Sequence, residues 1–423
     1  MFHLEEGWNF LFTEDPGTSI IEKKDSPEGY MKVLITTDWY RPVINGVVTS
    51  VLNLERELRA RGHEVRVLTV SRARSSWKED NTWYYLASYP LDKIYPKARV
   101  TLQFHHAFIQ ELIDWKPDVI HSQCELNSFI FAKKIADKTK APLVHTYHTV
   151  YEDYTHYFSL NEKIGKQAVR SFSRWILGKT QAVIVPTDKV RNLLVRYGVH
   201  QKISVVPTGI SLERFDVQFS EQDREKLRER LGVPKGNQVM VTLGRLAQEK
   251  NVQELIEYVH RLKRPNFTYL IIGDGPYRPE LQKLVKRLGE EKQILFTGMV
   301  TPAQTPYCYR LGDVFGSSSN SETQGLTYVE ALACGLPAIC RRDPCLDEVV
   351  FHGYNGYQYS NFQEFAEAVS RILDHPDRCQ EMSEHSFAIA EKYSSKLFAR
   401  RVEHVYKAVI AKAERKKQRK KKL

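Results

Sequence analysis

The sequence has few of the features that mark membrane-spanning, secreted or metal-binding chains. Its apolar runs fall short of the roughly 20 residues that a helix needs to cross a bilayer, so we expect no transmembrane segment. The opening stretch MFHLEEGWNFLFTEDPG is acidic and has no basic region followed by an apolar one, so we expect no secretory signal. The six cysteines show no C-x-x-C pair or other metal spacing, which favours free thiols in a reducing cytoplasm.

The net charge of +11 is concentrated in two segments. Residues 161–202 carry nine Lys and Arg against two acids, and residues 412–423 carry eight against Glu414, so each segment contributes +7. Such patches attract phosphate, in anionic lipid or in nucleic acid. No RNA- or DNA-binding motif accompanies the charge, so we expect lipid. The alternative for residues 412–423 is a solvated, disordered end.

From Met31 onward, short β-branched runs alternate with helical periods. Residues 32–37 predict a buried strand, and a helix is predicted over 46–61, ending at Gly62. The further strands expected are EVRVLTV, DVIHS, LVHTYH and AVIVPT, and then, after VVPTGISLERF, residues 239–243, 268–273, 294–298, 314–318 and 337–340. This alternation predicts an α/β chain of two Rossmann-like, doubly wound domains that face each other across a cleft.

The same pattern predicts where the segments of the chain begin and end. We expect an N-terminal extension over 1–30 (disordered, or an over-long gene start), an N-terminal domain over 31–206, a C-terminal domain over 207–395, a closing helix over 396–411 and a polybasic tail over 412–423.

The stretch SNSETQGLTYVEALACGLPAI, residues 319–339, follows a predicted strand and enters a helix near Leu326. A helix start binds phosphate or sugar oxygens through its free N–H groups and its dipole. The donors expected here are the amides of Gly325, Leu326 and Thr327. Glu322 in the loop and Glu330 in the helix could grip hydroxyls at both ends of an extended ligand. The spacing alone leaves the alternative open that they are a loop glutamate and a solvated helical one.

Two other strand ends in this half also suit phosphate. Arg245 and Lys250 follow the strand at 239–243, where a forked donor and a point charge can face a diphosphate. Gly275 in GDGP follows the strand at 268–273 and would let the backbone approach a ligand. Each signal is weak alone, but three in one domain predict an anion site.

These residues resemble a known family. Glu322-x7-Glu330, together with Arg245 and Lys250 in G-R-L-x-x-x-K, resembles the retaining GT-B glycosyltransferases of family four over roughly residues 31–411. The resemblance implies that Glu322 hydrogen-bonds the donor sugar, that Glu330 holds the ribose, and that Arg245 and Lys250 neutralise the diphosphate. It implies a nucleotide-sugar donor and a reaction without metal or other cofactor, and the sequence shows no D-x-D loop.

The first half is similar to the family as well. Pro42 and Gly46 in YRPVINGVVTS occupy the family's flexible first loop, which approaches the donor phosphates. His148 in HTYHT matches the family's histidine near the reacting sugar, although alone it would be read as a core histidine, and His145 is read as structural. Gln324 and Asn251 depart from the common pattern and resemble a subgroup that glucosylates diacylglycerol.

The resemblance implies transfer of glucose from UDP-glucose to the 3-hydroxyl of 1,2-diacylglycerol, by a peripheral enzyme on the inner face of the cell membrane. The alternatives are UDP-galactose, a glycolipid, soluble or polymer acceptor, and, more remotely, a non-catalytic nucleotide-sugar-binding membrane protein.

Residues 162–178 give separate support for a membrane partner. On a helix, Ile164, Ala168, Phe172 and Trp175 gather on one side and basic residues on the other. A basic amphipathic helix with Trp and Phe can lie in a bilayer interface. The alternative is a surface helix that packs the same apolar face on its own sheet.

Overall fold

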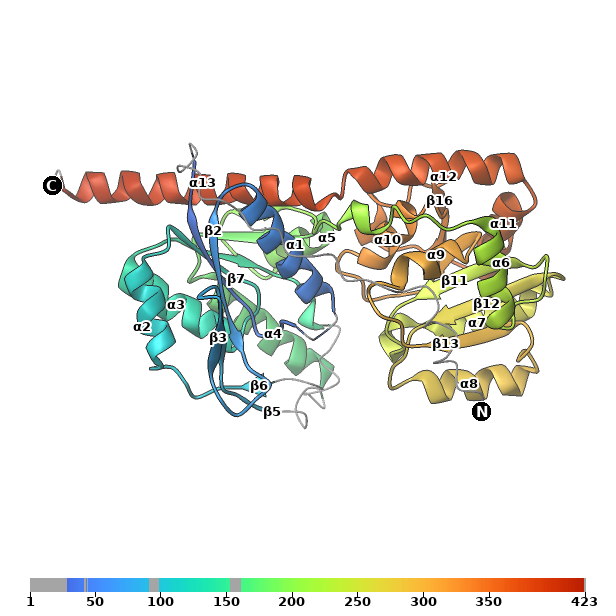
Figure 1. Ribbon diagram of the computed structural model, residues 1–423, viewed down its shortest axis with the longest axis horizontal. Helices are drawn as coiled ribbons and strands as arrows, with labels where there is room; N and C mark the ends of the chain where they lie inside the picture. The colour runs from blue at the N-terminus through green and yellow to red at the C-terminus, as the bar shows by residue number, and fades with distance from the viewer. Residues whose placement is uncertain (1–28, 42, 44, 91–98, 153–160, 422–423) are drawn as a thin grey trace. The chain divides into compact units, whose positions relative to one another are not determined.

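The computed structural model describes residues 29–41, 43, 45–90, 99–152 and 161–421 (Figure 1). The chain divides into two compact units. The N-terminal unit holds the described residues up to Ile210 together with those from Ser395 onward, and the C-terminal unit holds Ser211–Ser394. The expected N-terminal extension, apart from Gly29 and Tyr30, lies outside the described residues, as does Pro42.

The N-terminal unit is built on an eight-stranded sheet of order β10-β9-β8-β7-β1-β2-β4-β3. Every pair in it is parallel except β3 with β4. The strands are β1 (Lys32–Thr36), β2 (Glu64–Val70), β3 (Trp77–Glu79), β4 (Trp83–Leu86), β7 (Val119–Ser122), β8 (Leu143–Thr146), β9 (Ala182–Val185) and β10 (Ile203–Val205). A separate two-stranded sheet joins β5 (Tyr89–Pro90) to β6 (Arg99–Val100).

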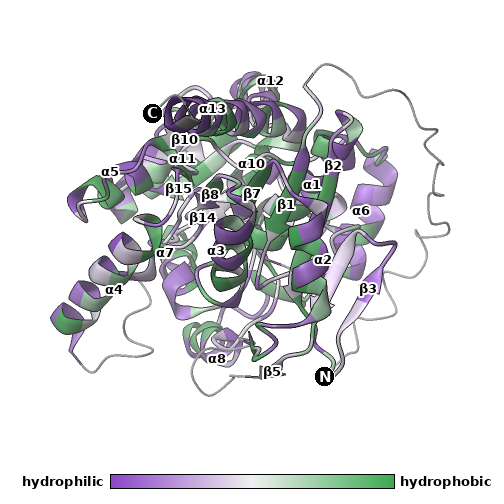
Figure 2. Ribbon diagram, turned by 90° about the vertical axis from the view of Figure 1, so that its left-hand side faces the viewer, coloured by the Kyte–Doolittle hydropathy of each residue, from purple (hydrophilic) through white to green (hydrophobic). Residues whose placement is uncertain are grey.

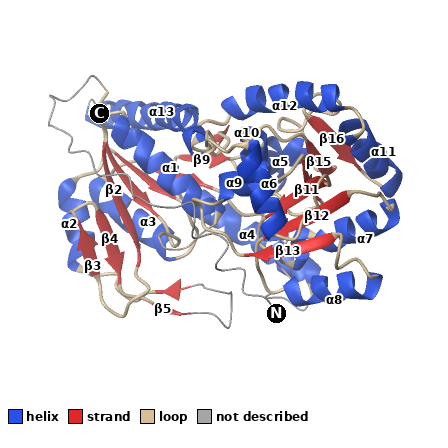
Figure 3. Ribbon diagram, turned by 45° about the vertical axis from the view of Figure 1, so that its right-hand side comes forward, coloured by secondary structure: helices blue, strands red, loops and turns tan. Residues whose placement is uncertain are grey.

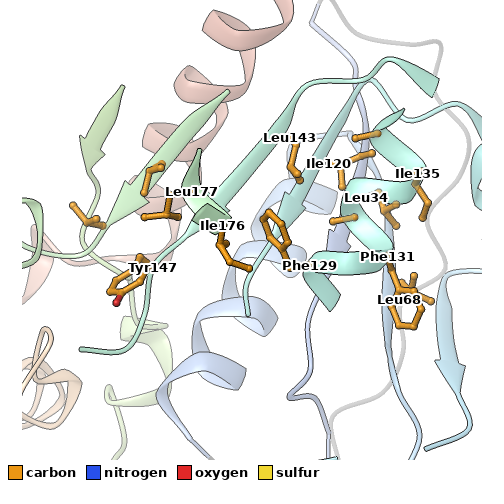
Figure 4. Close-up of a cluster of buried hydrophobic side chains, with 14 of the residues drawn as sticks. Leu34, Leu68, Ile120, Phe129, Phe131, Ile135, Leu143, Tyr147, Ile176 and Leu177 are labelled. Atoms are coloured by element: carbon orange, nitrogen blue, oxygen red, sulfur yellow. The ribbon is translucent and has the colours of Figure 1, made fainter. Parts of the chain in front are cut away.

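Helices cover both faces of this sheet, which is why its central strands read as continuous apolar runs. The helices are α1 (Gly46–Ala60), α2 (Ala107–Trp115), α3 (Asn127–Thr139), α4 (Glu162–Leu177), α5 (Asp188–Arg196) and α13 (Ser395–Lys421). Val33 and Ile35 of β1 pack into one core with α1 and α13. Leu34, which points to the opposite face, packs with Phe129 and Ile135 of α3 (Figure 4).

The C-terminal unit has a six-stranded, fully parallel sheet of order β13-β12-β11-β14-β15-β16 (Figure 3). Its strands are β11 (Gln238–Leu243), β12 (Phe267–Ile272), β13 (Ile294–Gly298), β14 (Val314–Ser317), β15 (Ala338–Arg341) and β16 (Gly356–Tyr359). Its helices are α6 (Glu221–Arg230), α7 (Val252–Leu262), α8 (Arg278–Leu288), α9 (Thr305–Arg310), α10 (Leu326–Ala333), α11 (Phe362–Leu373) and α12 (Pro376–Glu391). Short 3-10 turns occupy Leu212–Arg214, Gln248–Lys250 and Pro344–Leu346.

The two Rossmann-like domains predicted from the sequence are confirmed, and all ten expected strands are present. The strands that the pattern did not reveal are β3–β6, β10 and β16, most of them short or at a sheet edge. The chain crosses between units at Ile210 and Ser211 and returns to the N-terminal unit at Ser395. Helix α13 does not stop at residue 411 but continues through the polybasic segment to Lys421.

Candidate active site

The predicted donor residues of the C-terminal unit follow three strands that are neighbours in the sheet. Arg245 comes after β11, Gly275 after β12 and Glu322 after β14, and β11 lies between the other two. Because the three strands are parallel, their carboxyl ends meet at one edge, where ligands bind in open α/β sheets. The topology therefore gathers these loops.

Lys250 and Glu322 form the closest contact among the predicted residues. The ammonium Nζ of Lys250 donates to Oε1 of Glu322 at 2.6 Å, and both side chains are partly buried. The two loops are also joined through backbone groups, because the carbonyl of Glu249 accepts hydrogen bonds from the amide of Asn320 and the hydroxyl of Ser321. The cation expected at the diphosphate and the carboxylate expected at the donor sugar thus neighbour each other.

Arg245 is held more loosely beside this pair. Its guanidinium is about half exposed and lies 4.0 Å from Oε1 of Glu249, the outer limit of an ion pair. The other carboxylate oxygen of Glu249 is buried and has no hydrogen-bond partner among the described residues. The guanidinium group of Arg245 therefore keeps N–H donors that it can offer to an anion.

Gly275 is required by the packing of two loops. A Cβ there would lie 2.2 Å from the carbonyl oxygen of Leu246, and one on Gly273 would lie 1.9 Å from that of Gly244. The amide of Leu246 donates to the carbonyl of Asp274 at 3.0 Å. Gly275 was predicted to let the backbone approach a ligand, but in the structure the group that lies close to Gly275 is the neighbouring loop of the same unit.

Helix α10 begins as the sequence predicts. Gly325, directly before it, has a φ of 76°, and a Cβ there would meet the ring of Tyr328 at 2.7 Å. Only glycine tolerates both conditions. Gly325 caps the helix without a side chain, so the first-turn amides, including those of Leu326 and Thr327, point outward from the helix start.

Glu330 lies one turn into α10 and is bound by a residue that the sequence did not single out. The hydroxyl of Tyr309 on α9 donates to Oε2 of Glu330 at 2.9 Å. Burial raises the pKa of Glu330 to about 7, and the Tyr309 hydrogen bond and the charge of Arg214 only partly offset that effect. Glu330 is therefore not the solvated helical glutamate that the spacing left open.

His148 follows β8 in the N-terminal unit. Its Nε2 lies 2.7 Å from Oε1 of Gln123, which follows the adjacent strand β7. Burial lowers the pKa of His148 to about 3, with a further contribution from His145, so the ring is neutral at pH 7. His145 itself is fully buried, 3.3 Å from Glu125, as expected of a structural histidine.

Gly46 is the first residue of α1. The side chain of Asn45 caps this helix by accepting a hydrogen bond from the amide of Val48 at 2.8 Å. Pro42, the other predicted residue of that loop, lies outside the described residues. Gly46 and His148 belong to the N-terminal unit, and the Arg245–Lys250–Glu322 group belongs to the C-terminal unit.

Sequence reasoning missed several polar residues at the strand ends of the N-terminal unit. Asp38 follows β1, and burial raises its pKa to about 6 although the amide of Ser128 donates to it. The carboxylate of Glu125 accepts a hydrogen bond from the hydroxyl of Tyr151 and lies 3.3 Å from Nε2 of His145. Gln123 adjoins His148. Their position directly after predicted strands was a signal that could have found all of them.

Helix α4 keeps its apolar side in solvent. Ile164 is 66% exposed, Phe172 39% and Trp175 58%, and Ala168 is exposed too. The side chains that α4 buries are those of Val169, Ser173, Ile176 and Leu177. The alternative that the apolar face packs on the sheet holds only for Val169 and Ile176 at its flank, because Ile164, Phe172 and Trp175 stay exposed. Figure 2 shows the mixed hydropathy of this helix.

Basic side chains are exposed next to Trp175 and on the opposite side of the helix. The ammonium of Lys179 lies 3.3 Å from the centroid of the Trp175 ring, and Lys163, Arg170 and Arg174 are exposed. The end of α13 is a second basic surface, exposed from Glu414 to Lys420. Among the described residues, no helix combines the length and the apolar character needed to span a bilayer.

Two Rossmann-like units, each built on a mainly parallel sheet, are the architecture of the GT-B fold. Known folds agree: the Anabaena protein HepE, in a crystal structure with UDP and glucose, aligns with a TM-score of 0.70 at 19% identity over 89% of this chain and 100% of its own. Sucrose-phosphate synthase from Thermosynechococcus elongatus aligns with a TM-score of 0.69 at 17% identity over 90% of this chain and 99% of its own.

Sequence comparison defines the family. The model for Glycosyltransferase Family 4 matches residues 44–214, and the model for glycosyl transferases group 1 matches residues 223–388. The chain belongs to the family-four glycosyltransferases and is a hexosyltransferase.

Two relatives match nearly the whole chain. Alpha-monoglucosyldiacylglycerol synthase of Streptococcus pneumoniae is 33% identical over 89% of this chain and 85% of its own length. The enzyme of the same name from Acholeplasma laidlawii is 32% identical over 91% of this chain and 99% of its own.

Proposed function

We propose that this enzyme transfers glucose from UDP-glucose to the 3-hydroxyl of 1,2-diacylglycerol, with retained anomeric configuration, at the cytoplasmic face of the membrane. The observation that carries the proposal is the exposed face of Ile164, Phe172 and Trp175, on a helix whose other side carries exposed basic side chains. Such a face suits an enzyme whose acceptor resides in a bilayer. The two relatives named as monoglucosyldiacylglycerol synthases support the same substrate class.

The donor diphosphate is assigned to the loops after β11 and β14. Arg245 supplies a forked donor, Lys250 a point charge, and the start of α10 the amides of Gly325, Leu326 and Thr327. Donor binding would exchange the Lys250–Glu322 ion pair for two ligand contacts: Lys250 with the diphosphate and Glu322 with a sugar hydroxyl. Glu330 would hold the ribose.

The reaction breaks the bond between the anomeric carbon and the diphosphate oxygen, and the electron pair leaves with UDP. The acceptor hydroxyl forms its bond to the same face of the sugar while its proton passes to the departing phosphate oxygen. Arg245, Lys250 and the helix amides stabilise the charge that grows on that phosphate. We propose that this arrangement needs no metal ion, since the cations and amides already face the developing charge.

The N-terminal unit would supply the acceptor side of the reaction. His148 is assigned to the reacting sugar, as a neutral hydrogen-bonding group and not as a charge, because of its lowered pKa. We assign Gly46, at the start of α1, to the loop that in the family approaches the donor phosphates.

Membrane attachment is assigned to two surfaces of the N-terminal unit, the α4 face and the basic end of α13. Each Lys or Arg near an anionic surface contributes on the order of 1 kcal/mol at low salt. Binding would therefore be reversible and would weaken as ionic strength rises.

The substrate assignment is tested with labelled UDP-glucose and UDP-galactose, each offered with diacylglycerol vesicles, monoglucosyldiacylglycerol vesicles and a soluble glycan. We expect label in a lipid with one hexose, from UDP-glucose and diacylglycerol. Three results would each identify one of the alternative transferases and reject this one. They are label transferred only from UDP-galactose, label found only in a diglycosyl lipid, and label found only in the soluble glycan.

The membrane assignment is tested by co-sedimentation with vesicles that contain phosphatidylglycerol. The double variant Phe172→Ser/Trp175→Ser should bind about tenfold more weakly, because two apolar side chains no longer enter the interface. The matched control is Phe351→Ser/Phe387→Ser, which removes two exposed aromatics from the C-terminal unit. Equal binding by wild type and both variants would reject the α4 face.

A further inference from the structure

Gln123 is a buried polar residue at the carboxyl end of β7 that the reaction outlined above does not use. Its side chain is 2% exposed, and its backbone amide donates to the carbonyl of Thr36 at 2.8 Å, which fixes the chain next to β1. Its carboxamide oxygen Oε1 lies 2.7 Å from Nε2 of His148. Gln123 therefore orients the histidine assigned to the reacting sugar.

The other half of the same amide is unsatisfied. The Nε2 group of Gln123 is buried and has no hydrogen-bond partner among the described residues. An amide carries two N–H donors, and a buried donor without an acceptor is costly enough to be rare in folded proteins. An N–H donor that has no acceptor and lies beside His148 is suited to donate a hydrogen bond to an oxygen atom of a ligand.

The contact also determines which nitrogen of His148 carries the hydrogen. The ring is neutral because burial and the nearby His145 lower its pKa. When Oε1 of Gln123 accepts from Nε2, the hydrogen lies on Nε2 and the lone pair on Nδ1. The Nδ1 acceptor lies on the side of the ring away from Gln123, so on the Gln123 side the group left for a ligand is the Nε2 donor of Gln123, which matches a hydroxyl oxygen.

We propose that Gln123 is a positioning residue that holds His148 in its Nε2–H form and donates a hydrogen bond from its own Nε2 to a substrate hydroxyl. This inference rests on the proposed function for the identity of the substrates. The hydroxyl belongs either to the donor sugar or to the glycerol of the acceptor, and kinetics separate the two.

The first test needs no turnover. In the full chain labelled with 15N-histidine, the ring nitrogens of His148 are identified by comparison with His148→Asn. Wild type should show hydrogen on Nε2 at neutral pH. Gln123→Met, which keeps the length but removes both polar atoms, should lose that preference. An unchanged tautomer in Gln123→Met would overturn the inference.

A second variant keeps the test decisive if Gln123→Met folds poorly. Gln123→Glu keeps the acceptor and adds a negative charge, so it should raise the pH at which His148 titrates. The groups that face this ring are His145 on β8, His121 on β7 and, through His145, Glu125. A His148 titration in Gln123→Glu that matches wild type would contradict the contact.

The third measurement is steady-state kinetics with UDP-glucose and diacylglycerol vesicles. Gln123→Met should raise KM about tenfold for the substrate whose hydroxyl is bound, the equivalent of one hydrogen bond, and lower kcat as well. The matched control is Gln110→Met on exposed α2, which should leave KM and kcat unchanged. Unchanged KM for both substrates would overturn the donor role.

The two proposals can fail separately. If wild type forms no glycolipid at all, the proposed function fails, whereas the histidine spectra still decide whether Gln123 fixes the ring. If wild type is active and the spectra and KM values of Gln123→Met match wild type, only the inference on Gln123 is lost.

Discussion

Lys250 and Glu322 meet at 2.6 Å although 72 residues separate them in the chain. Their contact exists because β11 and β14 are adjacent parallel strands whose following loops share one edge of the sheet. Both charges are partly buried and stabilise each other, and the proposed donor would replace their contact with a phosphate for Lys250 and a sugar hydroxyl for Glu322. The Lys250–Glu322 contact is therefore the basis for assigning a diphosphate and a sugar to the site.

Replacing Arg245 tests that assignment in turnover. Arg245→Ala should lower kcat by about 10² or more, because a preorganised cation facing the leaving phosphate is lost. Arg287→Ala, on the exposed side of α8, is the control and should retain wild-type turnover. Near-normal kcat in Arg245→Ala would contradict the role of Arg245.

Glu330 predicts a pH-dependent stability. Its pKa is raised from 4.5 to about 7, so the folded state binds the proton more tightly than the unfolded state does. The folded protein is therefore favoured at low pH, and that contribution is lost as the pH rises from the unfolded value through about 7. Glu330→Gln, which stays neutral, should gain stability relative to wild type above pH 7 and differ little at pH 4.

Thermal unfolding at pH 4, 6 and 8 checks this expectation. Each pKa unit corresponds to about 1.4 kcal/mol, so a difference of a few kcal/mol between the two proteins should develop across the range. A constant difference at all three pH values would mean that the Glu330 carboxyl is not the buried, proton-binding group described above.

The family resemblance singled out the charged residues proposed for the site but not their polar neighbours. Arg245, Lys250 and Glu322 stood out because their motifs, taken together, are typical of the family. Tyr309 and Gln123 carry no such spacing, since a tyrosine on a helix and a glutamine after a strand occur at many positions. Only the topology, which brings α9 against α10 and β7 against β8, gives them partners.

At the scale of elements, helix α13 has two parts. Its docked half packs in the core of the N-terminal unit, and its free half, from Glu414 onward, is exposed up to Lys420. Phe398, Val402 and Tyr406 are buried in the core of the N-terminal unit, and the Tyr406 hydroxyl lies 2.6 Å from Nδ1 of the buried His121. From Glu414 to Lys420 every side chain is exposed. Like charges four apart, such as Lys416 and Lys420, disfavour this free half as an isolated helix.

Deleting residues 412–423 should therefore separate binding from folding. The truncated protein should unfold within about 0.5 kcal/mol of wild type, because the side chains from Glu414 to Lys420 are exposed. Its binding to phosphatidylglycerol vesicles should be weaker and less sensitive to salt. Unchanged binding across a salt series would show that the basic end takes no part in attachment.

The docked half should respond in the opposite way. Tyr406→Ala removes a fully buried ring and leaves His121 without its hydroxyl partner, so stability should fall by about 3–5 kcal/mol. Chemical denaturation measures the loss. A change below 1 kcal/mol would mean that α13 is not part of the N-terminal core.

Sequence periodicity described α4 well but could not say which side packs. Its apolar residues fall on one face of the helical wheel, and either packing or exposure satisfies that pattern. The structure buries Val169 and Ile176 beside it and leaves Phe172 and Trp175 in solvent. Which side of α4 is buried depends on the position of the sheet that the helix packs against, and the sequence of the helix alone does not give that position.

For the whole molecule, the alternation of strands and helices was enough to predict two Rossmann-like domains. The central strands are short, apolar runs rich in β-branched residues, as expected of strands that are covered on both faces. Strands β5 and β6, of two residues each, form through pairing with neighbours and leave almost no pattern of their own. The interdomain cleft expected from the sequence stays a prediction.

Metal independence is a prediction for the complete enzyme. Glycolipid synthesis should continue in EDTA at a rate within about twofold of the untreated enzyme, because protein cations and helix amides stabilise the leaving diphosphate. The control adds Mg²⁺ or Mn²⁺ to the chelated enzyme, which should change little. Loss of activity in EDTA with recovery on adding either metal would reject the proposed chemistry.

The claim at the centre of this account is that the carboxyl edge of the C-terminal sheet binds a diphosphate through Arg245 and Lys250. Calorimetric titration of wild type and Arg245→Ala with UDP and with uridine tests it most directly. Arg245→Ala should weaken UDP binding at least tenfold and leave uridine binding unchanged, since only UDP carries the diphosphate. Equal loss for both ligands, or no loss for UDP, would contradict the claim.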